Sequence, residues 1–193
     1  MTTPHWHDAF ASWYADAVAH EADVPDAMQL ATLDADGRPS LRTVLMKDHG
    51  PSGLTFYTNL GSRKAVALGA TPRATALFHW KSLQRQAIVE GDVTPVADSE
   101  ADAYWSTRPR GSQLGGWASR QSQLQPSRED LLTRLEQVEA RFHGVDVPRP
   151  TFWSGFRIAP HRVELWQGKP DRLHERRVWR RLGDAWVTET LDP

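Results

Sequence analysis

Residues 27–58, AMQLATLDADGRPSLRTVLMKDHGPSGLTFYT, contain the pattern that decides the fold. Residues 27–34 and 38–46 have the composition of strands, and Asp36-Gly37 between them is a strong signal for a tight hairpin turn. A loop that contains glycine and proline then leads to a third strand-like run over 54–58. This stretch therefore predicts an antiparallel sheet whose sequential strands are neighbours.

The strand signals continue on both sides of a helical region. Residues 73–80 and 85–94 read as two more strands around a short turn, and three or four strands are expected between 153 and 191. Many short antiparallel strands with inserted helices predict a mainly β, α+β fold built on a small antiparallel barrel. The expected organisation is one domain (1–193), made of an N-terminal helix (1–22), barrel strands (27–94), a helical insertion (98–143) and C-terminal strands (153–193).

The first helix is predicted over residues 4–20, where aromatic residues recur on one stripe. Thr3 is the expected N-cap, and Pro4 suits the first helical turn. Residues 108–125 are rich in Gly, Ser, Gln and Arg, and they are expected to be irregular.

Two more helices are predicted in the insertion. Residues 98–107 contain Ser99 and Asp102, which have the spacing of a capping box. Residues 127–142 form an amphipathic pattern that begins at Ser127, a good N-cap residue.

The composition is that of a globular protein. Of the 193 residues, 39% are apolar and 24% are charged, which excludes disordered, collagen-like and coiled-coil chains. The chain has no cysteine, so a disulfide scaffold and thiolate chemistry are excluded. No apolar stretch is long enough to span a bilayer, and the first Lys or Arg is Arg38, so the basic region of a signal peptide is not expected. A cytoplasmic protein without membrane association is expected.

The charge balance argues against a nucleic-acid-binding protein. The net charge is −1, whereas a duplex-binding domain is usually strongly basic. The dinucleotide, Walker and zinc-protease motifs are absent from the sequence. His5 and His7 could touch a metal, but two histidines alone are a weak pattern, so no metal site is expected.

Residues 57–64, YTNLGSRK, place two cations in the first turn of a short predicted helix. A helix N-terminus is already partly positive, so Arg63 and Lys64 there favour a bound anion. The alternative is a solvated turn whose charges are screened by salt. Arg42 and Lys47 would point to opposite faces of a regular strand and could serve two anions, or they could be the polar ends of an ordinary strand.

Tyr104, Arg108 and Ser112 could converge on a phosphate, with charge from the arginine and directional donors from the hydroxyl groups. A basic cap on the C-terminus of the helix over 98–107 is an equally open interpretation.

Residues 172–176, RLHER, would place Arg172, His174 and Arg176 on one face of a strand. Three potential cations on one face repel each other unless an anion or an electron-rich ring lies opposite. The alternative is an exposed polar strand face.

Together these segments resemble the pyridoxine (pyridoxamine) 5′-phosphate oxidase family, from about residue 27 to Pro193. Any one motif alone is weak evidence for the family. All of them together, in order and at family-like spacing, are highly specific for it. The motifs are R-x-V-L-x-K at 42–47, F-Y-T-N-x-x-S-R-K at 56–64, R-Q at 85–86, R-P-R-x-S-Q at 108–113, W-A-S-x-Q-S at 117–122, F-W-x-G-F-R at 152–157, W-Q-G at 166–168 and R-L-H-E-R at 172–176.

The resemblance implies an antiparallel split β-barrel that forms a homodimer and binds FMN between the subunits. By the same resemblance, FMN would be contacted by Arg42, Thr43, Val44, Leu45, Met46, Lys47, Tyr57, Thr58, Arg63, Lys64, Gln86, Gln121, Ser122, Trp166 and Arg176. The substrate phosphate would be held by Lys47, Tyr104, Arg108 and Ser112. Arg172 and His174 would bind the substrate beside the flavin as the catalytic pair.

The implied reaction oxidises pyridoxine 5′-phosphate or pyridoxamine 5′-phosphate to pyridoxal 5′-phosphate. FMN takes a hydride, O₂ is the final acceptor and becomes H₂O₂, and the amine substrate releases ammonia.

Two alternatives have the same fold. A phenazine-biosynthesis type of FMN oxidase would not need the substrate-phosphate set, and a non-catalytic flavin-binding barrel would not need residues 172–174. Many family members also carry a longer N-terminal segment that covers the substrate. This cover is expected to be absent here or supplied differently.

Overall fold

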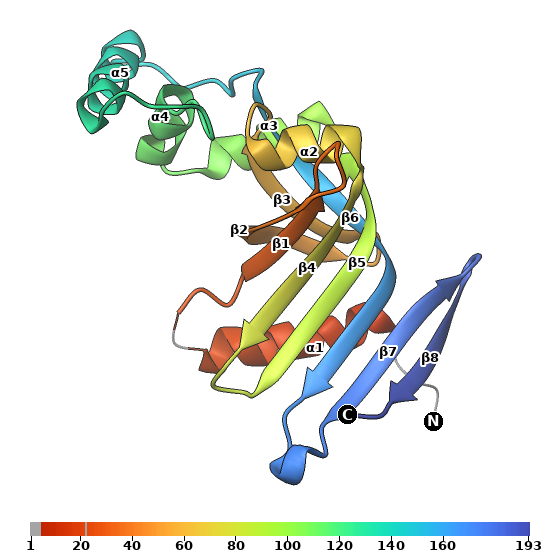
Figure 1. The fold of residues 1–193 in the computed structure, drawn as a ribbon. Coiled ribbons are helices and arrows are strands. Elements are labelled where there is room, and N and C mark those ends of the chain that lie inside the picture. The colour runs from red at the N-terminus through yellow and green to blue at the C-terminus, as the bar shows by residue number, and fades with distance from the viewer. Residues whose placement is uncertain (1–4, 22) are drawn as a thin grey trace.

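The computed structural model describes residues 5–21 and 23–193, and its centre is one antiparallel sheet (Figure 1). The strand order is β3-β2-β1-β4-β5-β6-β7-β8, and an additional pairing of β3 with β6 closes the first six strands into a barrel. The predicted mainly β fold with a split barrel is confirmed. The strands are β1 (Ala27–Leu33), β2 (Pro39–Gly50), β3 (Gly53–Asn59), β4 (Arg73–Trp80), β5 (Arg85–Pro95), β6 (Trp153–Gln167), β7 (Glu175–Leu182) and β8 (Ala185–Leu191).

Helices cover the two ends of the barrel, and α4 and α5 extend away from it (Figure 1). One end is covered by α1, while α2 and α3 lie at the other end. None of the helices in the described part of the chain is long and apolar enough to cross a membrane. The helices are α1 (Trp6–His20), α2 (Arg63–Ala70), α3 (Asp98–Thr107), α4 (Arg110–Ala118), α5 (Arg128–Arg141) and a single 3₁₀ turn, η1 (Pro170–Arg172).

The core combines the inner faces of the barrel strands with the aromatic face of α1. Trp6 and Phe10 of α1 are fully buried, and the Phe10 ring packs edge-on against Phe78 at 5.3 Å between ring centroids. The helix begins at Trp6 with His5 as its N-cap, while Thr3 and Pro4 lie outside the described residues. His7 contacts His49 at 3.2 Å between ring nitrogens, so this histidine joins α1 to β2.

The barrel wall is open between β2 and β3. These strands pair only from Met46 opposite Phe56 to Gly50 opposite Gly53, with a register shift between Met46 and Asp48. Residues 39–45 of β2 pair with β1 alone, and residues 57–59 of β3 pair with β6 alone. Backbone and side chains of both strands therefore face a gap, which is where the main pocket lies.

The expectation of an irregular segment over 108–125 is wrong for Arg110–Ala118, which form α4. Glycine lowers helix propensity, but here it permits close packing. A Cβ at Gly116 would lie 2.9 Å from the ring of Trp105, so a larger residue would not fit between α3 and α4. Leu114 and Ala118 are buried on the same helix.

The predicted capping box of α3 is also wrong. Ala97 is the N-cap of α3, and no side chain caps the helix. Asp102 instead accepts a hydrogen bond from Arg149 Nε at 2.6 Å, and Asp98 accepts one from Arg149 Nη2 at 2.8 Å. A partner 47 residues away in the sequence is not visible in a local spacing pattern. By contrast, α5 is capped by the Ser127 side chain, as predicted.

Candidate active site

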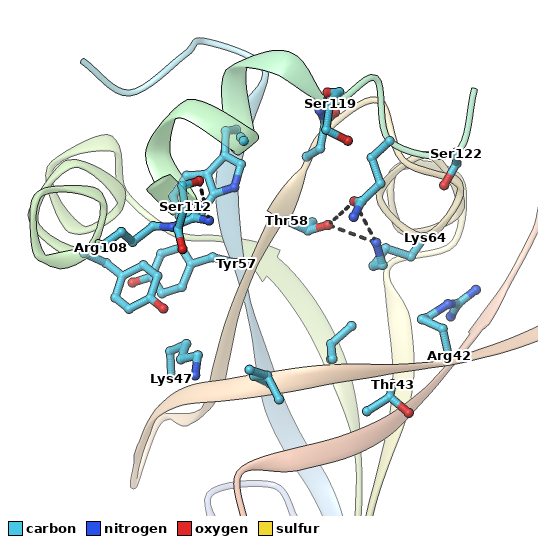
Figure 2. A pocket seen from close by; sticks show the side chains of 18 of the residues that line it. Arg42, Thr43, Lys47, Tyr57, Thr58, Lys64, Arg108, Ser112, Ser119 and Ser122 are labelled. Carbon is cyan, nitrogen blue, oxygen red and sulfur yellow. Dashed lines mark hydrogen bonds between the residues drawn. The ribbon is translucent and has the colours of Figure 1, made fainter. Parts of the chain in front are cut away.

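A pocket of about 1160 Å³ opens at the split between β2 and β3 (Figure 2). Its walls come from β2, β3, the start of α2, the end of α3, α4 and the loop after α4. The structure brings together most of the residues that the sequence predicts for the site. Those that line the pocket are Arg42, Thr43, Val44, Leu45, Lys47, Tyr57, Thr58, Arg63, Lys64, Tyr104, Arg108, Ser112, Gln121 and Ser122.

Lys64 is a buried cation at one end of this pocket, with only 8% of its surface exposed. Its ammonium group donates to Thr58 Oγ1 at 3.0 Å, Ser62 Oγ at 3.2 Å and Gln121 Oε1 at 3.0 Å (Figure 2). All three acceptors are uncharged, and no carboxylate lies within ion-pair distance of Lys64 in the described part of the chain. A buried charge without a counterion is costly, so this arrangement suits an anionic ligand.

Two arginines add to the positive charge around Lys64. Arg42 donates to Leu30 O at 2.8 Å and to Thr32 Oγ1 at 2.9 Å, which are again uncharged acceptors. Burial, and then the charge of Arg63, lowers the pKa of Arg42. Burial, and then the charge of Arg42, lowers the pKa of Lys64 to about 8. The first turn of α2 contains no acidic residue, so the positive helix terminus is not neutralised locally.

The other end of the pocket is an aromatic platform with a cation on it. The rings of Tyr57 and Tyr104 stack at 4.1 Å, and Tyr57 stacks on Trp153 at 5.4 Å. The Arg108 guanidinium lies 4.7 Å from the centre of the Trp153 ring, and it donates to Ser112 O at 3.0 Å. Burial lowers the pKa of Arg108 and raises that of Tyr57 to about 12. A guanidinium nevertheless stays charged at neutral pH, so Arg108, held by the Trp153 ring and Ser112 O, is a cation beside a neutral tyrosine.

Arg42 and Lys47, which were expected to point to opposite faces of a regular strand, both line this one pocket. The strand is irregular at Lys47, where the register with β3 shifts. The pocket also lies along the edge of β2 that has no partner strand. Side chains from both faces of a strand can reach such an open edge. Lys47 lies on the platform side of the pocket and Arg42 lies on the Lys64 side (Figure 2).

Trp153 lines the pocket, although the sequence motifs did not single it out as a site residue. An aromatic residue after a proline-rich link is more often part of a core. Trp153 is in fact 6% exposed and belongs to a small core cluster. Its position directly opposite Asn59 in the β3–β6 ladder is what brings it to the pocket.

Six of the predicted site residues do not line this pocket. Met46 is a core residue with 3% of its surface exposed. The other five, which we call the C-terminal group, lie on β5, β6, β7 and the turn before β7. The C-terminal group is Gln86, Trp166, Arg172, His174 and Arg176.

The C-terminal group is assembled by strand register. Trp166 lies directly opposite Gln86 on one side and opposite Arg176 on the other. The His174 ring packs on Trp166 at 4.6 Å. In Figure 1 the turn between β6 and β7 lies at the end of the barrel away from α2, so one chain holds the pocket and the C-terminal group apart.

The prediction that Arg172, His174 and Arg176 share one strand face is wrong. The strand β7 begins only at Glu175, and Arg172 ends η1. Asp171 and Arg172 both have left-handed backbone conformations, with φ of 55° and 61°. Two such residues in a row reverse the chain before β7, which removes the two-residue periodicity of a strand.

A buried carboxylate fixes Arg176. Glu164 Oε1 accepts from Arg176 Nε at 2.8 Å, and Oε2 accepts from Arg162 Nη2 at 2.6 Å. The Glu164 side chain is 4% exposed. Although burial alone would raise the pKa of Glu164, these two arginines lower it, so Glu164 stays ionised. Arg176 is thus held in one orientation.

Comparison with known proteins assigns the family. Residues 15–142 match the family model described as "Pyridoxamine 5'-phosphate oxidase". Residues 153–193 match one described as "Pyridoxine 5'-phosphate oxidase C-terminal dimerisation region". The chain belongs to the pyridoxamine 5′-phosphate oxidase family.

Similar members of this pyridoxamine 5′-phosphate oxidase family come from several bacteria. A pyridoxine/pyridoxamine 5′-phosphate oxidase of Sphingopyxis alaskensis is 52% identical over 184 residues, which cover 95% of this chain and 85% of the relative. One of Alkalilimnicola ehrlichii is 51% identical over 187 residues and covers 95% of each chain. The family resemblance stated from the motifs is confirmed.

Solved structures of the same shape support the fold. PhzG from Burkholderia lata 383, in complex with tetrahydrophenazine-1-carboxylic acid, has a TM-score of 0.92 and 33% identity, covering 96% of this chain and 91% of its own. A pyridoxamine 5′-phosphate oxidase-related, FMN binding protein from Nostoc punctiforme has a TM-score of 0.81 at 17% identity, covering 100% and 99%. Both have the oxidase-family barrel that is described above.

Proposed function

We propose that this chain is an FMN-dependent oxidase that converts pyridoxine 5′-phosphate or pyridoxamine 5′-phosphate to pyridoxal 5′-phosphate. O₂ is the acceptor, H₂O₂ is released, and the amine substrate also yields ammonia. The observation that carries the proposal is one pocket with two separate cationic ends, Lys64 at α2 and Arg108 on the aromatic platform. Such a pocket suits two phosphate esters, one on the cofactor and one on the substrate.

The residues around Lys64 fit the phosphate of FMN. A dianion would supply the counterion that Lys64, Arg42 and Arg63 lack, and Thr58 and Ser122 would add hydroxyl donors. The N–H groups at the start of α2 point to the same end. When bound, FMN would accept a hydride from the C4′ carbon of the substrate and pass the electrons to O₂. The protein's own contribution would then be binding and alignment.

The platform fits the substrate. Arg108 and Lys47 would hold its phosphate by charge, while Tyr104 and Ser112 would add directional hydrogen bonds. The neutral Tyr57 and its stacked neighbours would cover the face of a planar ring. Arg172 would orient the substrate and steady developing charge, and His174 would donate a hydrogen bond to a polar group of the substrate.

The distance between the pocket and the C-terminal group favours a site made by two copies of the chain. Residues 153–193 match a dimerisation region, and a twofold dimer uses the same patches on both subunits. We infer that the C-terminal group of one subunit completes the pocket of the other, with FMN between them. The chain would then be a single domain that is active as a homodimer.

The phenazine type of oxidase is the nearest rival, because PhzG has such a similar structure. Its bound tetrahydrophenazine-1-carboxylic acid carries no phosphate. Lys47, Arg108 and Ser112 all line the pocket of this chain, and a substrate without phosphate does not need this set. The structure therefore favours the phosphorylated substrate.

The direct test is to purify the protein, add FMN and record its visible spectrum, and then add pyridoxine 5′-phosphate under air. We expect a bound flavin spectrum, formation of pyridoxal 5′-phosphate, and one H₂O₂ per turnover. FMN at 100 times its dissociation constant should stabilise the fold by about 2.7 kcal/mol. If saturating FMN gives neither a bound spectrum nor a thermal shift, the proposal is wrong.

Proton uptake should accompany FMN binding. Because the pKa of Lys64 is about 8 without a ligand, a phosphate anion that favours the charged form would raise it. FMN binding above pH 8 should therefore take up a proton, and affinity should fall as the pH rises further. Calorimetry in two buffers of different ionisation enthalpy measures this uptake. Lys64→Met should abolish it, and an unchanged uptake in that variant would contradict the assignment of Lys64.

Replacing Arg108 or Lys47 by Ala should lower kcat/KM mainly through KM. For phosphorylated substrates, the lost charged hydrogen bond should lower kcat/KM by an amount that corresponds to about 1.5–3 kcal/mol. Activity on the unphosphorylated vitamin should change much less. Arg128→Ala, an exposed change on α5, is the charge-matched control. Equal losses for both substrates would instead indicate misfolding or a flavin defect.

A further inference from the structure

Lys47 differs from the other cations of the pocket because it already has a carboxylate partner. Its Nζ donates to Asp26 Oδ2 at 2.7 Å. Among the described residues, the other pocket cations (Arg42, Arg63, Lys64 and Arg108) have no carboxylate within 4.0 Å. Lys47 is also one of the two groups expected to attract the substrate phosphate. An anionic ligand at Lys47 would therefore meet Asp26 as a competitor.

The main chain of Asp26 is fixed at the junction of β1 and β2. Asp26 O accepts from Met46 N at 2.9 Å, directly beside the register shift that exposes Lys47 to the pocket. Ala27, the next residue, starts β1 opposite Leu45. The two side chains are 28% (Lys47) and 18% (Asp26) exposed, so both are only partly hydrated. The ion pair is therefore built into the junction of β1 and β2.

The charge of Asp26 acts inside the fold as well. It is the second cause, after burial, that raises the pKa of Tyr14 on α1. Tyr14 therefore stays protonated and neutral, so it adds no second negative charge beside Asp26. The only cation within ion-pair distance of Asp26 in the described chain is Lys47.

We propose that Asp26 tunes the affinity of the site for phosphate by competing for Lys47. This inference rests on the proposed function, in which Lys47 binds the substrate phosphate. The substrate and the product carry the same phosphate, so binding energy at this group is uniform and does not lower the barrier to reaction. A competing carboxylate weakens this uniform binding and lets the product leave. Asp26 is thus a positioning residue that acts through Lys47 and lowers the affinity of the site for phosphate-bearing ligands.

The test is Asp26→Asn, which keeps the shape of the side chain and removes its charge. Asp23→Asn, an exposed change three residues away, is the matched control. Binding is measured on FMN-saturated protein by tryptophan fluorescence and thermal shift, with inorganic phosphate, pyridoxal 5′-phosphate and pyridoxal as probes. In Asp26→Asn the ligand no longer has to displace a partly exposed ion pair. Both phosphate-bearing probes should therefore bind this variant about three- to tenfold more tightly. Pyridoxal should bind equally to all the proteins.

Three results overturn the proposal. Unchanged or weaker phosphate binding by Asp26→Asn would show that Asp26 does not compete. If Asp26→Asn also binds pyridoxal more tightly, by the same factor as the phosphate-bearing probes, the substitution has changed the pocket in general. Lys47→Ala separates this inference from the proposed function: if it weakens phosphate binding while Asp26→Asn does not tighten it, only the inference fails. If Lys47→Ala has no effect on phosphate binding, the assignment of Lys47 fails as well.

Discussion

Mixing two impaired variants, Lys64→Ala and Arg172→Ala, is expected to restore activity through subunit exchange. The helix α2, which contains Lys64, and the turn between β6 and β7, which contains Arg172, lie at opposite ends of the barrel in one chain (Figure 1). We propose that the two residues meet only across a dimer. In a mixed dimer, one site combines both substitutions and the other has neither. If half of the dimers are mixed, about a quarter of all sites are intact. The recovered activity should approach that fraction of the wild-type value.

The measurement needs an FMN concentration that saturates the wild type but not Lys64→Ala, so that each variant alone has little activity. A mixture of Lys64→Ala with the Lys64→Ala/Arg172→Ala double variant is the control. It forms mixed dimers just as readily, but every pocket in it lacks Lys64. If differently tagged chains copurify as mixed dimers and activity does not recover, each site lies within one chain.

The barrel was predictable from the sequence because its signals are local. The Asp36-Gly37 turn lies between two strands that pair from Ala27 opposite Leu45 to Leu33 opposite Pro39. The start of α2 was also predictable from the local sequence, because the helix begins at Arg63 and both cations lie in its first turn, as expected. Hairpins and helix starts are decided by residues close in the sequence.

Features that depend on distant partners were not predictable from periodicity. The acidic start of α3 resembles a capping box, but its carboxylates bind Arg149. The gap in the barrel depends on where β2 leaves β3, and neither strand carries a local mark of it. The separation of Lys64 from Arg172 follows from the closed topology. The motifs therefore predicted a set of candidate site residues, and the structure divided this set into two groups.

The backbone before β7 holds Arg172 and His174 in a defined arrangement that fits the role proposed for them at the reacting group. The left-handed conformation at Asp171 and Arg172 is unfavourable for residues with side chains, and such strain persists where the surroundings impose it. Lys169 N donates to His174 Nδ1 at 3.2 Å. In the neutral ring the proton is then on Nε2, so His174 can donate a hydrogen bond there. Arg172 is exposed, and its guanidinium is available to a ligand.

Arg172→Ala and His174→Ala are therefore expected to slow reduction of bound FMN without releasing it. Loss of a pre-positioned hydrogen-bond donor should lower the rate of FMN reduction, measured in an anaerobic single turnover, by roughly 10–10³-fold. Arg172→Ala should have the larger effect, because a planar guanidinium both orients the substrate and supplies charge. The flavin spectrum and FMN affinity should stay close to those of the wild type. Arg177→Ala, an exposed change on β7, is the control.

The comparison separates a catalytic role from a solvated surface turn. If these side chains only interact with water, both variants will reduce FMN at the wild-type rate with saturating substrate. Arg172→Lys sharpens the distinction, because lysine keeps the charge but not the two-pronged geometry of arginine. Partial recovery in Arg172→Lys would assign the remaining loss to orientation. Full recovery would show that charge alone is required at this position.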